Sequence, residues 1–165
     1  MAHHIGFAGY SNSGKTTLIA KVVIEFQRRG YRVAVMKHDA HGHYKEAAGA
    51  DSTTFVQAGA DAVVTISPEA VRVYERKEMP LLQEQLLAFA DYDFVFIEGF
   101  KKEKHPKIAV FRTIEQSEII QVLDPPPLAI VTDLEFAAAG IPTFHLDDVE
   151  AVSRYIESYF KTHQY

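Results

Sequence analysis

The chain has 165 residues, of which 47% are hydrophobic and 24% charged, and this composition is typical of one globular domain with a sizeable core. The formal net charge of −5 argues against a protein that attracts nucleic acid or an anionic membrane through its overall field. The sequence contains no cysteine, which excludes disulfide bonds and thiolate metal sites.

The N-terminal segment predicts a strand followed by a helix. Residues 5–8 form an apolar run with the length of a short buried strand. From Thr17 onward apolar residues recur at helical spacing, and Gly30 suits the position just past a helix that ends at Arg29. Because the strand begins so close to Met1, and no apolar run approaches the ~20 residues of a membrane span, we expect no signal peptide, no membrane segment and a cytoplasmic location.

Residues 9–16, between this strand and helix, read G-x-x-x-x-G-K-T, the pattern of a phosphate-binding loop or P-loop. Successive backbone N–H groups of such a loop surround a phosphate, and the helix N-terminus adds the positive end of its dipole. Lys15 would contact the β- and γ-phosphates, and the Thr16 hydroxyl would ligate Mg²⁺. The alternative is a glycine-rich turn that only caps the helix. The predicted nucleotide-binding residues of this segment are Gly9, Ser11, Asn12, Ser13, Gly14, Lys15, Thr16 and Thr17.

The rest of the chain alternates between apolar strands and helical stretches. Strands are predicted at residues 32–37, 94–98, 107–112, 128–132 and 143–145. Two more, at residues 61–67 and 70–76, are separated by a short turn and predict a β-hairpin. Helices are predicted at residues 52–58, at residues 80–90, and from a cap at Asp147 to about Thr162. This order predicts a single P-loop NTPase-like α/β domain over residues 1–165, with a mostly parallel central sheet flanked by helices.

Acidic residues lie at the carboxyl ends of two of the buried strands, and ligands of parallel sheets bind at these ends. Glu98 is the candidate that holds Mg²⁺ together with Thr16, directly or through water; alternatively it is a carboxylate that faces water. Asp133 follows the strand at residues 128–132, where GTPases carry the aspartate that reads the N1/N2 edge of guanine. The rest of the guanine motif is missing from this sequence.

The segment after the strand at residues 32–37 is polar and rich in histidine. Asp39 is a candidate catalytic residue that orients the attacking water or helps to hold Mg²⁺, or else it forms an Asx turn that opens the loop. His38, His41 and His43 could ligate a metal ion, although three histidines within one loop are more often exposed and unliganded.

A run of lysines follows Glu98. It forms a local basic patch that is either a solvated face or, beside a nucleotide site, a second anion site built around Lys101 and Lys107. The complete patch comprises Lys101, Lys102, Lys104 and Lys107.

Taken in order, these motifs resemble the molybdopterin-guanine dinucleotide biosynthesis protein B (MobB) family over nearly the whole chain. The resemblance rests on the P-loop, on K-H-D-x-H at residues 37–41, A-D-S at residues 50–52, A-G-A at residues 58–60, and I-E-G-F-K at residues 97–101 leading to K-I at residues 107–108. By motif matching, residues 9–17 carry over as the phosphate loop, Glu98 as the Walker-B-like acid, and Lys101 as part of the loop that follows.

The resemblance implies a GTP-binding protein of molybdenum cofactor assembly with GTP and Mg²⁺ as its ligands. It implies assistance to a partner protein, the molybdenum cofactor guanylyltransferase that transfers GMP to molybdopterin, and slow hydrolysis of GTP. It also implies a homodimer, and molybdopterin itself is a candidate ligand.

Two function classes remain open. The first is this GTP-binding accessory protein; the second is an autonomous P-loop kinase or ligase-like enzyme that acts on a small anionic substrate. A kinase needs a lid with arginines over the phosphates, whereas the loop after residues 94–98 offers lysines. The catalytic groups expected near the phosphates are Lys15 and Asp39, and no arginine is expected to adjoin the P-loop, so hydrolysis should be slow.

Overall fold

The computed structural model describes residues 1–39 and 50–163, which form two compact units. The first unit contains Met1–His38 and the chain from Leu86 onward, and the second contains Asp39–Gln85. Because the second unit lies in sequence between the two parts of the first, it is an insertion. A single nucleotide-binding domain over residues 1–165 stays a prediction.

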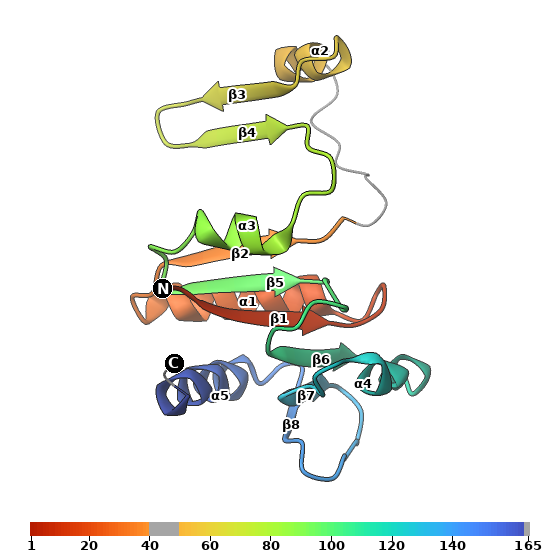
Figure 1. The fold of residues 1–165 in the computed structure, drawn as a ribbon. Helices are drawn as coiled ribbons and strands as arrows, with labels where there is room; N and C mark the ends of the chain where they lie inside the picture. The colour runs from red at the N-terminus through yellow and green to blue at the C-terminus, as the bar shows by residue number, and fades with distance from the viewer. Residues whose placement is uncertain (40–49, 164–165) are drawn as a thin grey trace. The chain divides into compact units, whose positions relative to one another are not determined.

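Six parallel strands form the sheet of the first unit, in the order β2-β5-β1-β6-β7-β8 (Figure 1). Each strand lies within two residues of its predicted bounds. Short apolar runs buried on both faces are typical of parallel sheets, and the strands at residues 94–98, 107–111 and 129–132 are runs of this kind. The strands are β1 (His3–Ala8), β2 (Val33–Lys37), β5 (Phe94–Glu98), β6 (Lys107–Phe111), β7 (Ala129–Thr132) and β8 (Thr143–His145).

Two long helices cover one face of this sheet. The helices α1 (Lys15–Arg28) and α5 (Val149–Thr162) bury Val22, Phe26 and Ile156 against alternate residues of the strands, such as Phe7 and Phe96. The turn η1 (Glu115–Glu118) and the short helix α4 (Ile119–Val122) follow β6 on the other face. Ile119 is fully buried there with Ala109 and Phe111, which point away from the first core because side chains alternate along a strand.

The helix ends test two sequence predictions. Gly30 adopts a φ of 86° just past α1, which confirms the predicted glycine stop. The predicted cap of α5 is wrong by one residue: Oδ1 of Asp148, rather than Asp147, accepts a hydrogen bond of 3.1 Å from the Ala151 N–H.

The second unit contains the predicted hairpin. Its strands β3 (Ala62–Ile66) and β4 (Val71–Glu75) pair antiparallel, and α2 (Asp51–Gln57) precedes them. Val64 pairs with Val73, and Ile66 with Val71; residues two apart share a face, so these four side chains form one apolar face, which we call the hairpin face. All four are more than half exposed. The helix α3 (Leu82–Leu87) begins in this unit and ends in the first.

The parallel sheet, the flanking helices and the hairpin confirm the predicted α/β fold. In the part of the chain that the structure describes, no helix combines the length and the apolar character needed to cross a membrane.

Candidate nucleotide-binding site

The loop between β1 and α1 has the backbone that a phosphate loop requires. Asn12 and Gly14 adopt positive φ values of 58° and 92°, and Gly14 is the N-cap residue of α1. A Cβ atom at Gly9 would lie 2.3 Å from the carbonyl oxygen of Val110 and 2.6 Å from Oγ of Ser13, so only glycine fits there. The glycine spacing of the motif is therefore explained by a close approach at Gly9 and by a left-handed backbone at Gly14.

The Lys15 ammonium lies inside this loop. Its Nζ donates to the carbonyl oxygen of Tyr10 at 2.7 Å and to Oγ of Ser13 at 3.4 Å. Burial lowers the pKa of Lys15, the Glu98 carboxylate acts to raise it, and the nearby Lys101 and Lys37 charges lower it further. A phosphate group near Nζ would supply the negative charge that the carbonyl partner lacks.

Thr16 and Glu98 meet at the carboxyl end of the sheet. The Thr16 hydroxyl donates to Oε1 of Glu98 at 3.0 Å. Phe7 of β1 pairs with Glu98 of β5, and this register brings the carboxylate beside the strand that leads into the P-loop. A hydroxyl and a carboxylate are the hard oxygen ligands that Mg²⁺ prefers, and Mg²⁺ usually takes few protein ligands besides phosphates and water. The two side chains therefore fit the predicted ion.

The structure places an arginine against the P-loop, and the expectation that none adjoins it is wrong. Arg112 follows β6, and its Cδ lies 3.5 Å from the position of a Cβ on Gly14; Leu146, which follows β8, lies at 3.6 Å. Nε of Arg112 donates to Oδ2 of Asp133, the residue after β7, at 3.4 Å. The rule that polar residues just past the strands form the site would have found Arg112, because it comes directly after Phe111.

Gln116, within η1, also touches the loop. Its Nε2 donates to the Ser11 carbonyl oxygen at 3.2 Å, and its Oε1 accepts from the backbone N–H of Arg112 at 2.9 Å. No sequence pattern indicates this contact, because η1 has no apolar periodicity and its position depends on the fold.

The predicted second anion site is not present as proposed. Lys101 does lie beside the P-loop, with Nζ 4.3 Å from the centre of the Tyr10 ring. Lys107, in contrast, is 1% exposed, and its ammonium donates to the carbonyl oxygens of Glu103 and His105. Its role is to satisfy buried carbonyl groups at the start of β6, so it is not available to an external anion together with Lys101.

The remaining candidates lie as follows. The ring of His38 stacks on Phe100 at 4.5 Å, and its backbone N–H donates to the Glu98 carbonyl oxygen at 2.9 Å. Asp39 begins the second unit, and its catalytic role stays a prediction. The other two histidines of the predicted metal loop, His41 and His43, lie outside the described residues. Within the described ranges no group of three or more His, Cys, Asp or Glu side chains could hold a metal ion.

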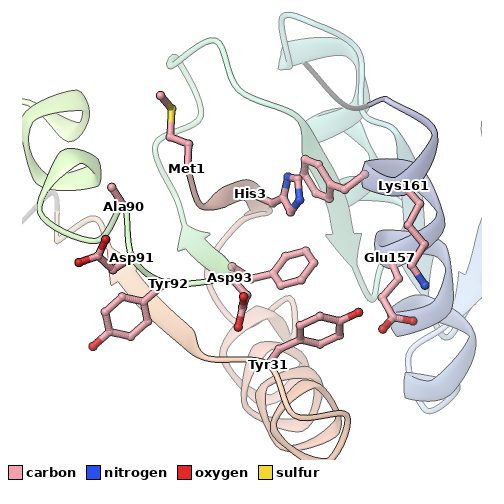
Figure 2. A pocket seen from close by; sticks show the side chains of 11 residues that line it. Met1, His3, Tyr31, Ala90, Asp91, Tyr92, Asp93, Glu157 and Lys161 are labelled. Atoms are coloured by element: carbon pink, nitrogen blue, oxygen red, sulfur yellow. The ribbon is translucent and has the colours of Figure 1, made fainter.

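A cavity of about 430 Å³ opens at the opposite, amino-terminal ends of the strands, where β1 and β5 begin (Figure 2). His3, Tyr31 and Phe94 line it together with Glu157 of α5. Burial, and then a hydrogen bond to Glu157, raise the pKa of Tyr31, whose hydroxyl points toward Glu157 in Figure 2. The P-loop follows the carboxyl end of β1, so this cavity is separate from the candidate nucleotide site.

Comparison with known proteins agrees with this geometry. The family model "Molybdopterin guanine dinucleotide synthesis protein B" matches residues 4–133, well over half of the chain. The chain belongs to the MobB family. The match includes the P-loop, Glu98, Arg112, Gln116 and Asp133, and it confirms the resemblance that the ordered motifs indicated.

Individual members of the MobB family are similar over most of their length. The molybdopterin-guanine dinucleotide biosynthesis adapter protein of Haemophilus influenzae is 34% identical over 132 residues, which are 78% of this chain and 74% of that protein. A probable adapter protein of the same description from Bacillus subtilis is 30% identical over 150 residues, 87% of this chain and 86% of the relative. The crystal structure of Bacillus subtilis MobB is 27% identical, with a TM-score of 0.75 over 94% of this chain and 96% of that one.

Proposed function

We propose that this protein is a GTP-binding adapter of molybdenum cofactor biosynthesis, which hydrolyses GTP slowly with Mg²⁺. The observation that carries the proposal is the meeting of Thr16 and Glu98 beside a P-loop with Lys15 inside it. Membership of the MobB family, whose relatives are described as molybdopterin-guanine dinucleotide biosynthesis adapter proteins, supports the pathway.

The residues of the loop would bind the triphosphate by replacing hydrogen bonds within the loop with hydrogen bonds to the phosphates. Lys15 would release the Tyr10 carbonyl oxygen and contact the β- and γ-phosphates, while the N–H groups of the loop and of the first turn of α1 point at the phosphate oxygens. Thr16 and Glu98 would hold Mg²⁺, which neutralises part of the phosphate charge when bound.

The side chain of Arg112 passes Gly14, the N-cap residue of α1, and its Nε donates to Asp133. The Asp133 carboxylate would accept the two N–H groups at the N1/N2 edge of guanine, and it is already oriented by the hydrogen bond from Arg112. Leu146 offers an apolar surface beside them. This set supports recognition of guanine more fully than Asp133 alone.

The adapter would act on the guanylyltransferase that transfers GMP to molybdopterin. The hairpin face of Val64, Ile66, Val71 and Val73 supports a homodimer, since a two-stranded hairpin is marginally stable unless its apolar side is covered. In this proposal the sheet unit binds the nucleotide, and the second unit supplies the contact with another copy.

Titration calorimetry with GTP and ATP, with and without Mg²⁺, tests the proposal. Wild-type protein should bind GTP with Mg²⁺, and Lys15→Ala should lose binding because the phosphates lose their ammonium partner. Lys21→Ala is the matched control, since Lys21 lies on the same helix with only a surface ion pair to Asp147. The melting temperature of ligand-free Lys15→Ala should stay close to that of wild type, and GTP should raise only the wild-type and control values. Wild-type protein that binds neither nucleotide would refute the proposal.

A further inference from the structure

We propose that Gln116 is a positioning residue that presets the phosphate loop through its side-chain amide. The inference rests on the proposed nucleotide-binding function and adds a residue to it from a segment outside the P-loop motif. The inference is based on two hydrogen bonds of one amide group. Nε2 donates to the Ser11 carbonyl oxygen, and Oε1 accepts from the Arg112 N–H.

The first hydrogen bond fixes a peptide plane of the P-loop. In a trans peptide the C=O of one residue and the N–H of the next point in opposite directions. When Gln116 holds the Ser11 carbonyl on its own side, the Asn12 N–H must point away from Gln116. A phosphate nest needs successive N–H groups that converge on one point, so each peptide plane must be turned correctly before the anion arrives. Asn12 itself has a φ of 58°, a conformation that a free loop would populate rarely.

Gln116 is itself held firmly. Its backbone N–H donates to Oγ1 of Thr113 at 3.3 Å, and the turn continues into α4, where Ile119 is fully buried in the core. The amide therefore extends from an anchored turn. A side chain fixed at its base pays less conformational entropy to hold the loop than a mobile one would.

The second hydrogen bond connects the same amide to the other side of the candidate site. The Arg112 N–H is held at 2.9 Å, its side chain passes Gly14, and its Nε reaches Asp133. Gln116 thus connects the P-loop at Ser11 to Arg112 at the end of β6. The amide can do both because it offers an N–H donor and a carbonyl acceptor on the same group.

Two substitutions separate these contacts. Gln116→Met keeps the length of the side chain and removes both hydrogen bonds. Gln116→Glu keeps an acceptor for the Arg112 N–H but has no donor for the Ser11 carbonyl. Gln121→Met is the matched control, because Gln121 is an exposed glutamine on the adjoining helix α4.

The probe is inorganic tripolyphosphate with Mg²⁺, measured by calorimetry, because it reports on the loop without the base. We expect Gln116→Met to weaken binding about 10-fold, as loss of one to two hydrogen bonds implies, and Gln116→Glu to weaken it at least as much. Gln121→Met should bind like wild type. The melting temperatures of the ligand-free variants should stay within about 3 °C of wild type, since the amide is partly exposed and outside the core.

Backbone hydrogen exchange at Arg112 provides a readout that needs no ligand. Exchange should become faster in Gln116→Met and stay protected in Gln116→Glu, although both variants lose phosphate affinity. If Gln116→Met binds tripolyphosphate within twofold of wild type, or if Arg112 exchange is the same in all variants, the positioning role is wrong. Wild-type protein that binds tripolyphosphate but shows no preference for GTP would refute the guanine part of the proposed function and leave the role of Gln116 standing.

Discussion

The Thr16 hydroxyl donates a hydrogen bond of 3.0 Å to the Glu98 carboxylate, across 82 positions of sequence. The two side chains come from the first helix and from a strand on the other side of an inserted unit. Their meeting depends on the parallel register of β1 with β5, in which Phe7 lies opposite Glu98.

Substitution of this pair should change the Mg²⁺ dependence of nucleotide binding. In Glu98→Gln the carboxylate charge is lost, and in Thr16→Ala the hydroxyl ligand is lost, so the gain in GTP affinity on adding Mg²⁺ should shrink about 10-fold or more. Affinity measured in excess chelator should change little. Glu150→Gln, an exposed carboxylate on α5, is the control. An unchanged Mg²⁺ effect in both variants would show that the ion is held elsewhere.

Asp133 should determine the preference for GTP over ATP. Guanine offers two N–H donors to this carboxylate and adenine does not, so wild-type protein should favour GTP by about 10-fold or more. Asp133→Ala should remove most of this preference, while Asp147→Ala, which alters another exposed carboxylate, should retain it. Equal affinity of wild-type protein for the two nucleotides would count against guanine recognition, and unchanged discrimination in Asp133→Ala would count against this residue.

Hydrolysis of GTP by the isolated protein should be slow, below ~0.1 s⁻¹ at saturating nucleotide. GTPases without a supplied arginine turn over at roughly 10⁻⁴ to 10⁻² s⁻¹, and even an arginine in cis gives only about 10⁻² s⁻¹. Arg112 adjoins the loop but is engaged by Asp133. Phosphate release should fall further in Glu98→Gln and should rise when the guanylyltransferase is added. A turnover of several per second by the protein alone would favour the autonomous enzyme.

The hairpin face should mediate self-association. Val73→Glu puts a charge in the middle of this face, opposite Val64, and burying that charge against a second copy would be costly. We expect light scattering to give a dimer for wild type and a monomer for Val73→Glu at micromolar concentration. Val122→Glu, which alters an exposed valine of α4, should remain dimeric. A dimer that persists in Val73→Glu would place the interface outside the hairpin.

His105 should make the protein less stable in acid. The residue is 6% exposed, and neither ring nitrogen has a hydrogen-bond partner among the described residues. Burial, with smaller effects from Lys107 and His4, lowers the pKa of His105 from 6.5 to about 4. The unfolded chain therefore takes up the proton first as pH falls through this range. Stability is full above pH 6.5 and declines toward pH 4, by up to roughly 3 kcal/mol.

His105→Phe removes this titration and keeps a ring of similar size. Urea unfolding between pH 4.5 and 7.5 should give a flatter acid limb for this variant than for wild type. His145→Phe, which alters a histidine with a half-exposed side chain, should keep the wild-type slope. Parallel acid limbs for wild type and His105→Phe would mean that His105 does not couple folding to pH.

The sequence predicted the fold well because its strands are short, apolar and separated by recognisable helices and turns. The P-loop and Glu98 could be found for the same reason, since motif and strand end coincide. Arg112 was missed although it directly follows β6, because its side chain was not expected near the P-loop; Gln116 was missed because its nearness to the loop arises from strand order, which places β6 beside β1. Lys107 was misjudged because charge alone does not reveal that an ammonium satisfies carbonyl groups in the interior.

The position of β1 between β5 and β6 also determines when β1 can pair with its neighbours during synthesis. β1 is synthesised before both of its neighbours, which lie 85 or more residues further along the chain. Until Glu98 and then Phe111 have left the ribosome, both edges of β1 lack their native partners, and such edges are prone to pair with other chains. The P-loop therefore emerges well before Glu98 and Arg112, so a chain interrupted within the inserted unit carries the motif without these neighbours.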